Sequence, residues 1–214
     1  MRLVERDYEI LREVDRWPCV LSRQIRLLVG FPSQSPCDRR IRLLMEAGYL
    51  ERKRYLYGVP GLLSLTYQGR ILIGVSKNGE KPRLEQINHD MAVLDTAIYF
   101  MLKYGVEKSG VLSEKQLHQI DGFGNRRHRP DFSFDKDGKS CCVEIELSIK
   151  SKERLLKNLK DNFDKYDLQY WVVPKGRTRI STLIKANEND YPNIKLIQYE
   201  EVESYVRTYG KSES

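Results

Sequence analysis

The sequence predicts an α+β protein of two domains. Three helical patterns and two strand-like segments fill the first third of the chain. A polar, turn-rich stretch follows, and beyond it helices and strands are mixed. We therefore expect a first domain at residues 1–75, a linker at 76–87, a second domain at 88–209 and a disordered tail at 210–214.

Composition limits the classes of protein to consider. Of 214 residues, 31% are charged and 40% are hydrophobic, as in a water-soluble globular protein. We expect no membrane span and no signal peptide, because no apolar run is of membrane-spanning length and no basic-then-apolar stretch opens the sequence. Its four cysteines show no CxxC spacing, which favours reduced thiols over disulfides or a zinc site. We expect a cytoplasmic protein with no membrane partner.

Positive charge is concentrated in the first domain. Residues 1–80 contain 14 Lys and Arg against 9 Asp and Glu, whereas the rest contains 23 against 21. Most of the formal net charge of +7 therefore lies in the first third of the chain. Such a distribution is typical of a domain that binds a polyanion, although a solvated basic surface has the same composition.

The spacing of apolar residues predicts three helices in the first domain, at 5–17, 21–29 and 36–47. Ser35 is expected to cap the third helix, with Pro36 in its first turn and Gly48 at its end. Two strand-like segments, 49–55 and 62–67, follow with a turn between them. Three helices and a basic hairpin predict a winged helix-turn-helix.

Basic residues gather on the two elements of this domain that could enter DNA. The third helix would present its arginines to phosphates and guanine edges, and the hairpin would contact the backbone or the minor groove. A winged helix that binds protein is the alternative, and the clustering favours DNA. The residues concerned are Ser35, Arg39, Arg40 and Arg42 on the helix and Arg52, Lys53 and Arg54 on the hairpin.

The second domain is expected to contain helices and strands in a defined order. A helix comes first, then three strands, a helix and a strand, followed by one more helix and strand and a final helix. Asp135-Lys136-Asp137-Gly138 is the expected hairpin turn between the second and third strands. The expected ranges are 88–104, 111–120, 132–134, 141–147, 150–166, 169–173, 179–186, 194–199 and 200–208.

Three carboxylates accompany the predicted hairpin of the second domain. Asp131 opens one strand, and Glu144 and Glu146 lie within the next, where alternation directs both to one face of the sheet. Carboxylates brought together in this way are unfavourable unless a divalent cation or basic side chains share the site. The basic side chains available on the following helix are Lys150, Lys152 and Arg154.

This order of elements, with Pro-Asp before one strand and Glu-x-Glu within the next, resembles the PD-(D/E)XK, or restriction-endonuclease-like, fold. The resemblance implies that Asp131 and Glu144 hold Mg²⁺ and that the reaction is metal-assisted hydrolysis of a phosphodiester. Glu146 stands where the family has lysine, as in some restriction enzymes, and would be a third ligand or a general base. Lys150 is a candidate for the relocated cation, and Glu114 for a further acid.

The chain as a whole resembles the replication-relaxation family of plasmids and mobile elements over roughly residues 5–175. The resemblance rests on the N-terminal helices and hairpin and on short motifs in the second domain. It implies a DNA-binding protein of plasmid replication control, mobilisation or relaxosome assembly. The motifs are His89-Asp90-Met91-Ala92-Val93, Arg129-Pro130-Asp131, the segment 143–151 and Tyr170-Trp171-Val172-Val173-Pro174.

These observations lead to one principal hypothesis and two alternatives. The principal hypothesis is a sequence-specific double-stranded DNA-binding protein, homodimeric, that acts as a replication or mobilisation accessory factor. The first alternative is a Mg²⁺-dependent DNA endonuclease or nickase. The second is an adaptor that binds a relaxase or replication protein. We favour a nuclease-like fold without catalytic activity, because no lysine completes the (D/E)xK pattern.

Overall fold

A computed structural model describes residues 2–76, 81–122, 128–148 and 151–210. The chain divides into two compact units, Met1–Leu94 with Gly210–Ser214, and Asp95–Tyr209. The division falls within a continuous helix, α5 (Ile87–Tyr104). Residues 77–80 of the expected linker and 211–214 of the expected tail lie outside the described residues, as does Lys150.

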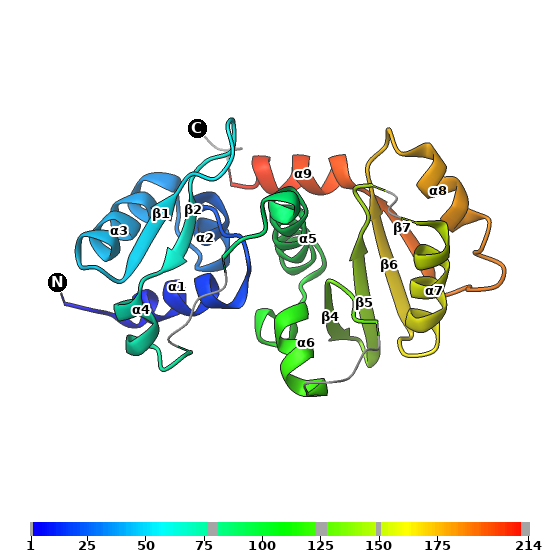
Figure 1. The fold of residues 1–214 in the computed structure, drawn as a ribbon, viewed down its shortest axis with the longest axis horizontal. Coiled ribbons are helices and arrows are strands. Elements are labelled where there is room, and N and C mark those ends of the chain that lie inside the picture. Colours follow the sequence, from blue (N-terminus) through cyan, green and yellow to red (C-terminus); the bar gives the residue numbers. More distant parts are fainter. Residues whose placement is uncertain (1, 77–80, 123–127, 149–150, 211–214) are drawn as a thin grey trace. The chain divides into compact units, whose positions relative to one another are not determined.

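The first unit begins with three helices that share an apolar core (Figure 1). Side chains at helical spacing on each of them are fully buried, among them Ile10, Ile25, Ile41 and Leu44. Two strands, a short helix and a 3₁₀ helix come next. The elements are α1 (Glu5–Arg16), α2 (Ser22–Leu28), α3 (Gln34–Glu46), β1 (Leu50–Lys53), β2 (Leu62–Leu65), α4 (Tyr67–Leu72) and η1 (Leu84–Gln86).

The expected hairpin after the third helix is present. β1 and β2 pair antiparallel, with Leu50 opposite Leu65 and Lys53 opposite Leu62. Val20, between α1 and α2, adds a single bridge to Leu63. The chain between the two strands is anchored by apolar side chains of its own, which pack against a buried cluster that includes Leu21 and Ile87. These anchoring side chains are Tyr55, Leu56 and Val59. Tyr57, between them in sequence, is fully exposed.

The start of α3 differs from the sequence prediction by two residues. Ser33, not Ser35, occupies the N-cap position, and its side chain makes no capping hydrogen bond. Ser35 is instead an exposed residue of the first helical turn. Pro36 fits within that turn because the first amide groups of a helix have no intrahelical acceptor, so its missing N–H costs no hydrogen bond.

The second unit is built on a five-stranded sheet with the order β3-β4-β5-β6-β7. The β3–β4 and β4–β5 pairs are antiparallel, and the β5–β6 and β6–β7 pairs are parallel. No helix in the described ranges is long and apolar enough to cross a membrane. After α5, the elements are η2 (Lys108–Gly110), β3 (Leu112–Ser113), α6 (Glu114–Asp121), β4 (Phe132–Lys136), β5 (Lys139–Ile145), α7 (Lys152–Phe163), β6 (Leu168–Val173), α8 (Thr178–Lys185), β7 (Ile194–Gln198) and α9 (Tyr199–Thr208).

Helices cover both faces of this sheet. α7 and α8 lie on one face and α5 and α9 on the other (Figure 1). Trp171 and Val173 of β6 pack with Leu159 of α7 on the first face. On the opposite face, Phe100 of α5 contacts the Tyr170 ring at a centroid distance of 4.9 Å. Alternation along β6 therefore divides its side chains between two apolar layers.

The expected strand at 111–120 is wrong for most of its length. Only Leu112–Ser113 is a strand, and Glu114 begins α6. Ser113 starts the helix early because its hydroxyl accepts from the Gln116 amide while the Gln116 side chain bonds back to the Ser113 amide, a capping box. Glu114 is thus an exposed helical residue 3.7 Å from His118, not an acid on the sheet.

All four cysteines are buried and unpaired, two in each unit. Burial raises the pKa of the Cys19 and Cys37 thiols to about 12 and that of Cys141 to about 11. It also raises the pKa of Cys142 well above the ordinary value. The expectation of reduced cysteines is consistent with this arrangement.

Candidate nucleic-acid interface and acidic site

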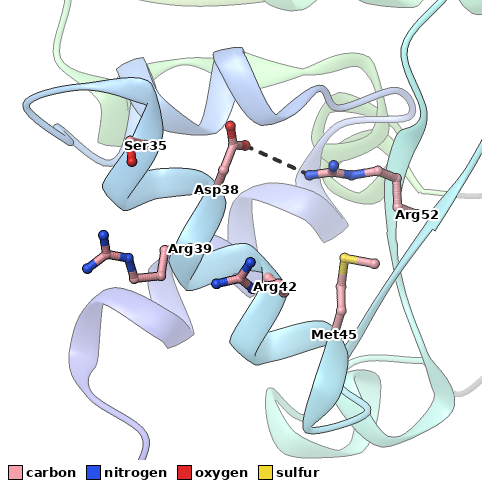
Figure 2. A pocket seen from close by; sticks show the side chains of 6 residues that line it. All are labelled: Ser35, Asp38, Arg39, Arg42, Met45 and Arg52. Carbon is pink, nitrogen blue, oxygen red and sulfur yellow. Dashed lines mark ion pairs between the residues drawn. The ribbon is translucent and has the colours of Figure 1, made fainter.

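A basic pocket lies on the surface formed by α3 and β1 (Figure 2). Arg39 and Arg42 come from neighbouring turns of α3, and Arg52 comes from β1. Of the sequence-predicted DNA-binding residues, the structure brings these three together with Ser35. The complete lining is Ser35, Asp38, Arg39, Arg42, Met45 and Arg52.

The helical period explains why these side chains face solvent. Cys37, Ile41 and Leu44 are fully buried on one side of α3. Residues 35, 38, 39 and 42 fall on the other side, because positions three and four apart share a helix face. The apolar core of the first unit thus orients the arginines outward.

The ion pairs around the pocket are exposed. Arg42 lies 3.8 Å from Glu46, and both side chains are more than 60% exposed. Lys53 lies 2.7 Å from Glu51 on the edge of β1, again in contact with solvent. Pairs of this kind contribute about 0–1 kcal/mol, so a phosphate can replace the carboxylate at little cost. Arg54, just beyond β1, is also exposed.

Arg40 is placed differently from its neighbours. Its guanidinium donates to both carboxylate oxygens of Asp7 in α1, and the Asp7 side chain is fully buried. This hydrogen bonding raises the pKa of Arg40 above its ordinary value. Asp7 also accepts a 2.8 Å hydrogen bond from the Val4 amide. Arg40 therefore joins α1 to α3 within the first unit, a structural role that the sequence prediction of a DNA contact did not include.

The second unit brings Asp131 and Glu144 to the same end of its sheet. Asp131 precedes β4, and its Oδ2 accepts a 2.7 Å hydrogen bond from the Ile145 amide. Glu144 is buried near the end of β5, where its Oε1 accepts from Asn162 Nδ2 of α7 at 2.9 Å. The same Oε1 is hydrogen-bonded to the ring Nε2 of His128.

Protonation of the Glu144–His128 pair follows from its burial. Burial raises the pKa of Glu144, and the hydrogen bond from His128 counters part of that rise. Burial is the largest single influence on His128 and opposes its charge, but the hydrogen bond to Glu144 and the negative charges nearby together outweigh it, so the pKa of His128 is raised. Both shifts have the same sign, so the folded environment favours a proton on the Glu144–His128 pair.

Of the other predicted members of the acidic site, Glu146, Lys152 and Arg154 fall within the described residues. Glu146 lies just past the end of β5 and is half-buried, with its amide donating to the Val172 carbonyl at 2.9 Å. The alternation that would align it with Glu144 applies only within the strand. Lys152 and Arg154 are exposed at the start of α7. The basic side chain that is hydrogen-bonded to Glu144 is that of His128, and this residue was not singled out from the sequence.

Protein donors already occupy part of the acidic site. Within the described part of the chain, no group of three or more His, Cys, Asp and Glu residues is placed to hold a metal. Glu144 Oε1 already serves two donors, and Asp131 Oδ2 serves a backbone amide. Mg²⁺ requires several oxygen ligands in near-octahedral geometry. One oxygen of each carboxylate thus takes part in a hydrogen-bonded network, and the tentative Mg²⁺ site at Asp131 and Glu144 stays a prediction.

Arg129 of the Arg-Pro-Asp motif forms a buried ion pair with α6. Its side chain is 5% exposed, and its Nε donates to Asp121 Oδ2 of α6 at 2.9 Å. The motif thus joins the end of α6 to the start of β4. The Arg-Pro-Asp motif therefore has at least a structural role in this fold.

Part of the second unit matches a protein family of unknown function. Residues 100–178 match DUF3240, described as a protein family of unknown function. The match covers well under half of the chain and falls in the second unit. Curated proteins gave no match, and neither did solved structures.

Proposed function

We propose that this chain is a sequence-specific double-stranded DNA-binding protein and that its first unit is a winged helix-turn-helix. The observation that carries the proposal is the exposed arginine pocket on α3 and β1. Three helices, the β1–β2 hairpin and the Val20 bridge provide the framework that such a domain needs. The concentration of positive charge in this part of the sequence supports the same proposal.

In this proposal, α3 enters the major groove and the hairpin lies along the adjacent backbone. Arg39 and Arg42 contact phosphates and base edges from α3. From the hairpin, Lys53 and Arg54 contact the backbone or the minor groove, whereas Arg52 lines the pocket beside Arg39 and Arg42 and faces the groove that α3 enters. Arg40 has no direct contact, because its guanidinium is engaged by Asp7.

Salt-dependent binding tests the proposal. The Arg39→Ala/Arg42→Ala variant should bind duplex DNA more weakly, with a shallower dependence of log affinity on log salt, by about 1.8 for two lost phosphate contacts. Lys152→Ala/Arg154→Ala is the matched control, because it removes two exposed positive charges from α7 instead. Equal affinity of wild type and the α3 variant would refute the assignment of α3.

We further propose a homodimer that acts in replication or mobilisation of a plasmid or mobile element, with a relaxase or replication protein as a possible second partner. Dimeric helix-turn-helix proteins bind half-sites about one helical turn apart, which makes spacing testable. Sedimentation with and without a duplex would give the stoichiometry. A single monomer per duplex at all concentrations would exclude the dimer.

For the second unit, we propose a nuclease-like fold without nuclease activity. The helix, three antiparallel-paired strands, crossover helix and parallel strand of this unit support the PD-(D/E)XK resemblance. The bonds that occupy Glu144 argue against catalysis. Incubation of supercoiled plasmid with the protein and Mg²⁺ or Mn²⁺ should give no nicking. Nicking that Asp131→Ala abolishes would instead support the Mg²⁺-dependent endonuclease.

A further inference from the structure

An acidic side chain stands within the basic pocket. Asp38, on the exposed face of α3, is opposed by Arg52 of β1, and the two are joined in Figure 2. The distance from Asp38 Oδ1 to Arg52 Nη2 is 3.9 Å. This is close enough for electrostatic attraction but too long for a hydrogen bond. The guanidinium is therefore oriented without a donor being used by Asp38.

Asp38 is itself fixed by two other polar side chains. Its Oδ1 accepts from Gln34 Nε2 at 3.0 Å and from the hydroxyl of Ser22 in α2. Gln34 Nε2 also lies 2.6 Å from Ser22 Oγ, which closes the group. The carboxylate thus has a defined position between α2 and the first turns of α3, and it presents a fixed negative charge to Arg52.

Arg52 is confined from a second direction by Gly61. A Cβ on Gly61 would lie 2.7 Å from Arg52 Cγ and 3.1 Å from Arg52 Cδ. The methylene stem of Arg52 therefore occupies the space that a side chain at position 61 would need. A carboxylate attracts the guanidinium end while the bare glycine backbone accommodates the stem, so both ends of the Arg52 side chain are positioned.

A fixed carboxylate on a DNA-binding face repels phosphate, so it does not serve affinity. We propose that Asp38 and Gly61 position Arg52 as a specificity-determining residue that reads a base edge, with guanine O6 and N7 as the chemistry it fits. This proposal rests on the DNA-binding function proposed above. It separates the arginines of the pocket into one that selects sequence and two, Arg39 and Arg42, that mainly supply affinity.

Three single substitutions separate orientation from charge. Asp38→Asn removes the negative charge beside Arg52, and Gly61→Ala displaces the Arg52 stem without any change of charge. Glu46→Gln is the control, because it removes an equal charge from the same helix, next to Arg42. Duplexes are first enriched from a random pool with the wild-type protein. Each variant is then measured against one enriched and one scrambled duplex, alongside its thermal unfolding.

The expected result is a loss of selectivity without a loss of affinity. Asp38→Asn and Gly61→Ala should each reduce the ratio of enriched to scrambled affinity about tenfold or more, which is the scale of one bidentate base contact. Asp38→Asn should bind the scrambled duplex at least as tightly as wild type. Glu46→Gln should retain the wild-type ratio, and all three should retain the wild-type unfolding midpoint within a few degrees.

Each contrary result has its own meaning. Wild-type selectivity in both Asp38→Asn and Gly61→Ala would overturn the role of Arg52 while leaving DNA binding intact. Equal loss of selectivity in Glu46→Gln would also overturn it, because charge alone would then explain the effect. Failure of the wild-type protein to bind any duplex would refute the proposed function itself.

Discussion

Charge is used in opposite ways in the two units. In the first, Arg39, Arg42 and Arg52 line an open pocket, and the nearby ion pairs are solvated. In the second, Glu144 and His128 are both nearly inaccessible and bonded to each other. Solvated charge is available to a partner because little is lost when its ion pair opens. A buried ion pair mainly stabilises the fold, because breaking it leaves two buried polar groups without their partners.

The comparison also applies within a single helix. Arg39 and Arg40 are adjacent in sequence, yet the first faces the pocket and the second is bonded to a buried carboxylate. A cluster of arginines in a sequence is therefore not a cluster of equivalent ligands. The local partner of each guanidinium decides whether it serves a ligand or the fold.

Loss of the buried acid should have the largest effect on stability. Glu144→Ala leaves His128 and Asn162 without their acceptor, and we expect the free energy of unfolding to fall by about 3–5 kcal/mol. Glu144→Gln should be milder, because its amide oxygen still accepts a hydrogen bond. Urea unfolding followed by circular dichroism would measure both. A fall in unfolding free energy of less than about 1 kcal/mol in Glu144→Ala would mean that the Glu144–His128 pair contributes little to stability.

The next effect in size concerns the two neighbouring arginines of α3. Arg40→Ala leaves the buried Asp7 carboxylate without its cation, so stability should fall by about 2 kcal/mol or more. Arg39→Ala should change stability by about 0.5 kcal/mol or less, because its side chain is exposed. Addition of Asp7→Asn to Arg40→Ala should restore part of the loss. Equal unfolding midpoints for the two single variants would remove the distinction drawn between them.

A smaller effect should appear as a dependence of stability on pH. The pKa of His128 is raised in the folded chain, so its contribution is complete below the unfolded pKa of about 6.5 and is lost as pH rises through the folded value. Unfolding free energy should fall as pH rises above about 6.5, with a slope no steeper than about 1.4 kcal/mol per pH unit for one proton. His128→Gln should flatten this slope. An equal slope in the variant would assign the effect to another group.

The smallest effect tests whether the hairpin tip meets DNA. Tyr57 is fully exposed, whereas Trp17 and Trp171 are buried. Tyr57→Trp should leave stability within about 0.5 kcal/mol of wild type and add one tryptophan accessible to acrylamide. Bound duplex should protect this tryptophan from quenching. Unchanged quenching with DNA bound would exclude the tip from the interface.

The sequence was sufficient for elements set by local patterns. Apolar spacing located α1, α2 and α3 within two residues, and the turn at Asp137-Gly138, where both residues have positive φ, located the β4–β5 hairpin. The start of α6 was missed although Ser113 and Gln116 form a recognisable capping box. That error came from treating a mixed apolar segment as a strand.

The site was harder to predict because its contacts join distant parts of the chain. Asp131 was expected to lie close to Glu144, and both lie at the same end of the sheet. The bond between His128 and Glu144 spans 16 residues, and that between Asp7 and Arg40 spans 33. Neither follows from a periodicity. Charge counts therefore located the basic unit but could not separate its structural arginine from its exposed ones.

The reactivity of the four buried cysteines should report on unfolding. At neutral pH, thiols with raised pKa values and no solvent contact should react slowly with alkylating reagents, and unfolding should make them reactive. Cys19 and Cys37 lie in one unit, and Cys141 and Cys142 in the other. Pulsed alkylation followed by peptide mass spectrometry would thus measure the unfolding rate of each unit separately, with no engineered residue.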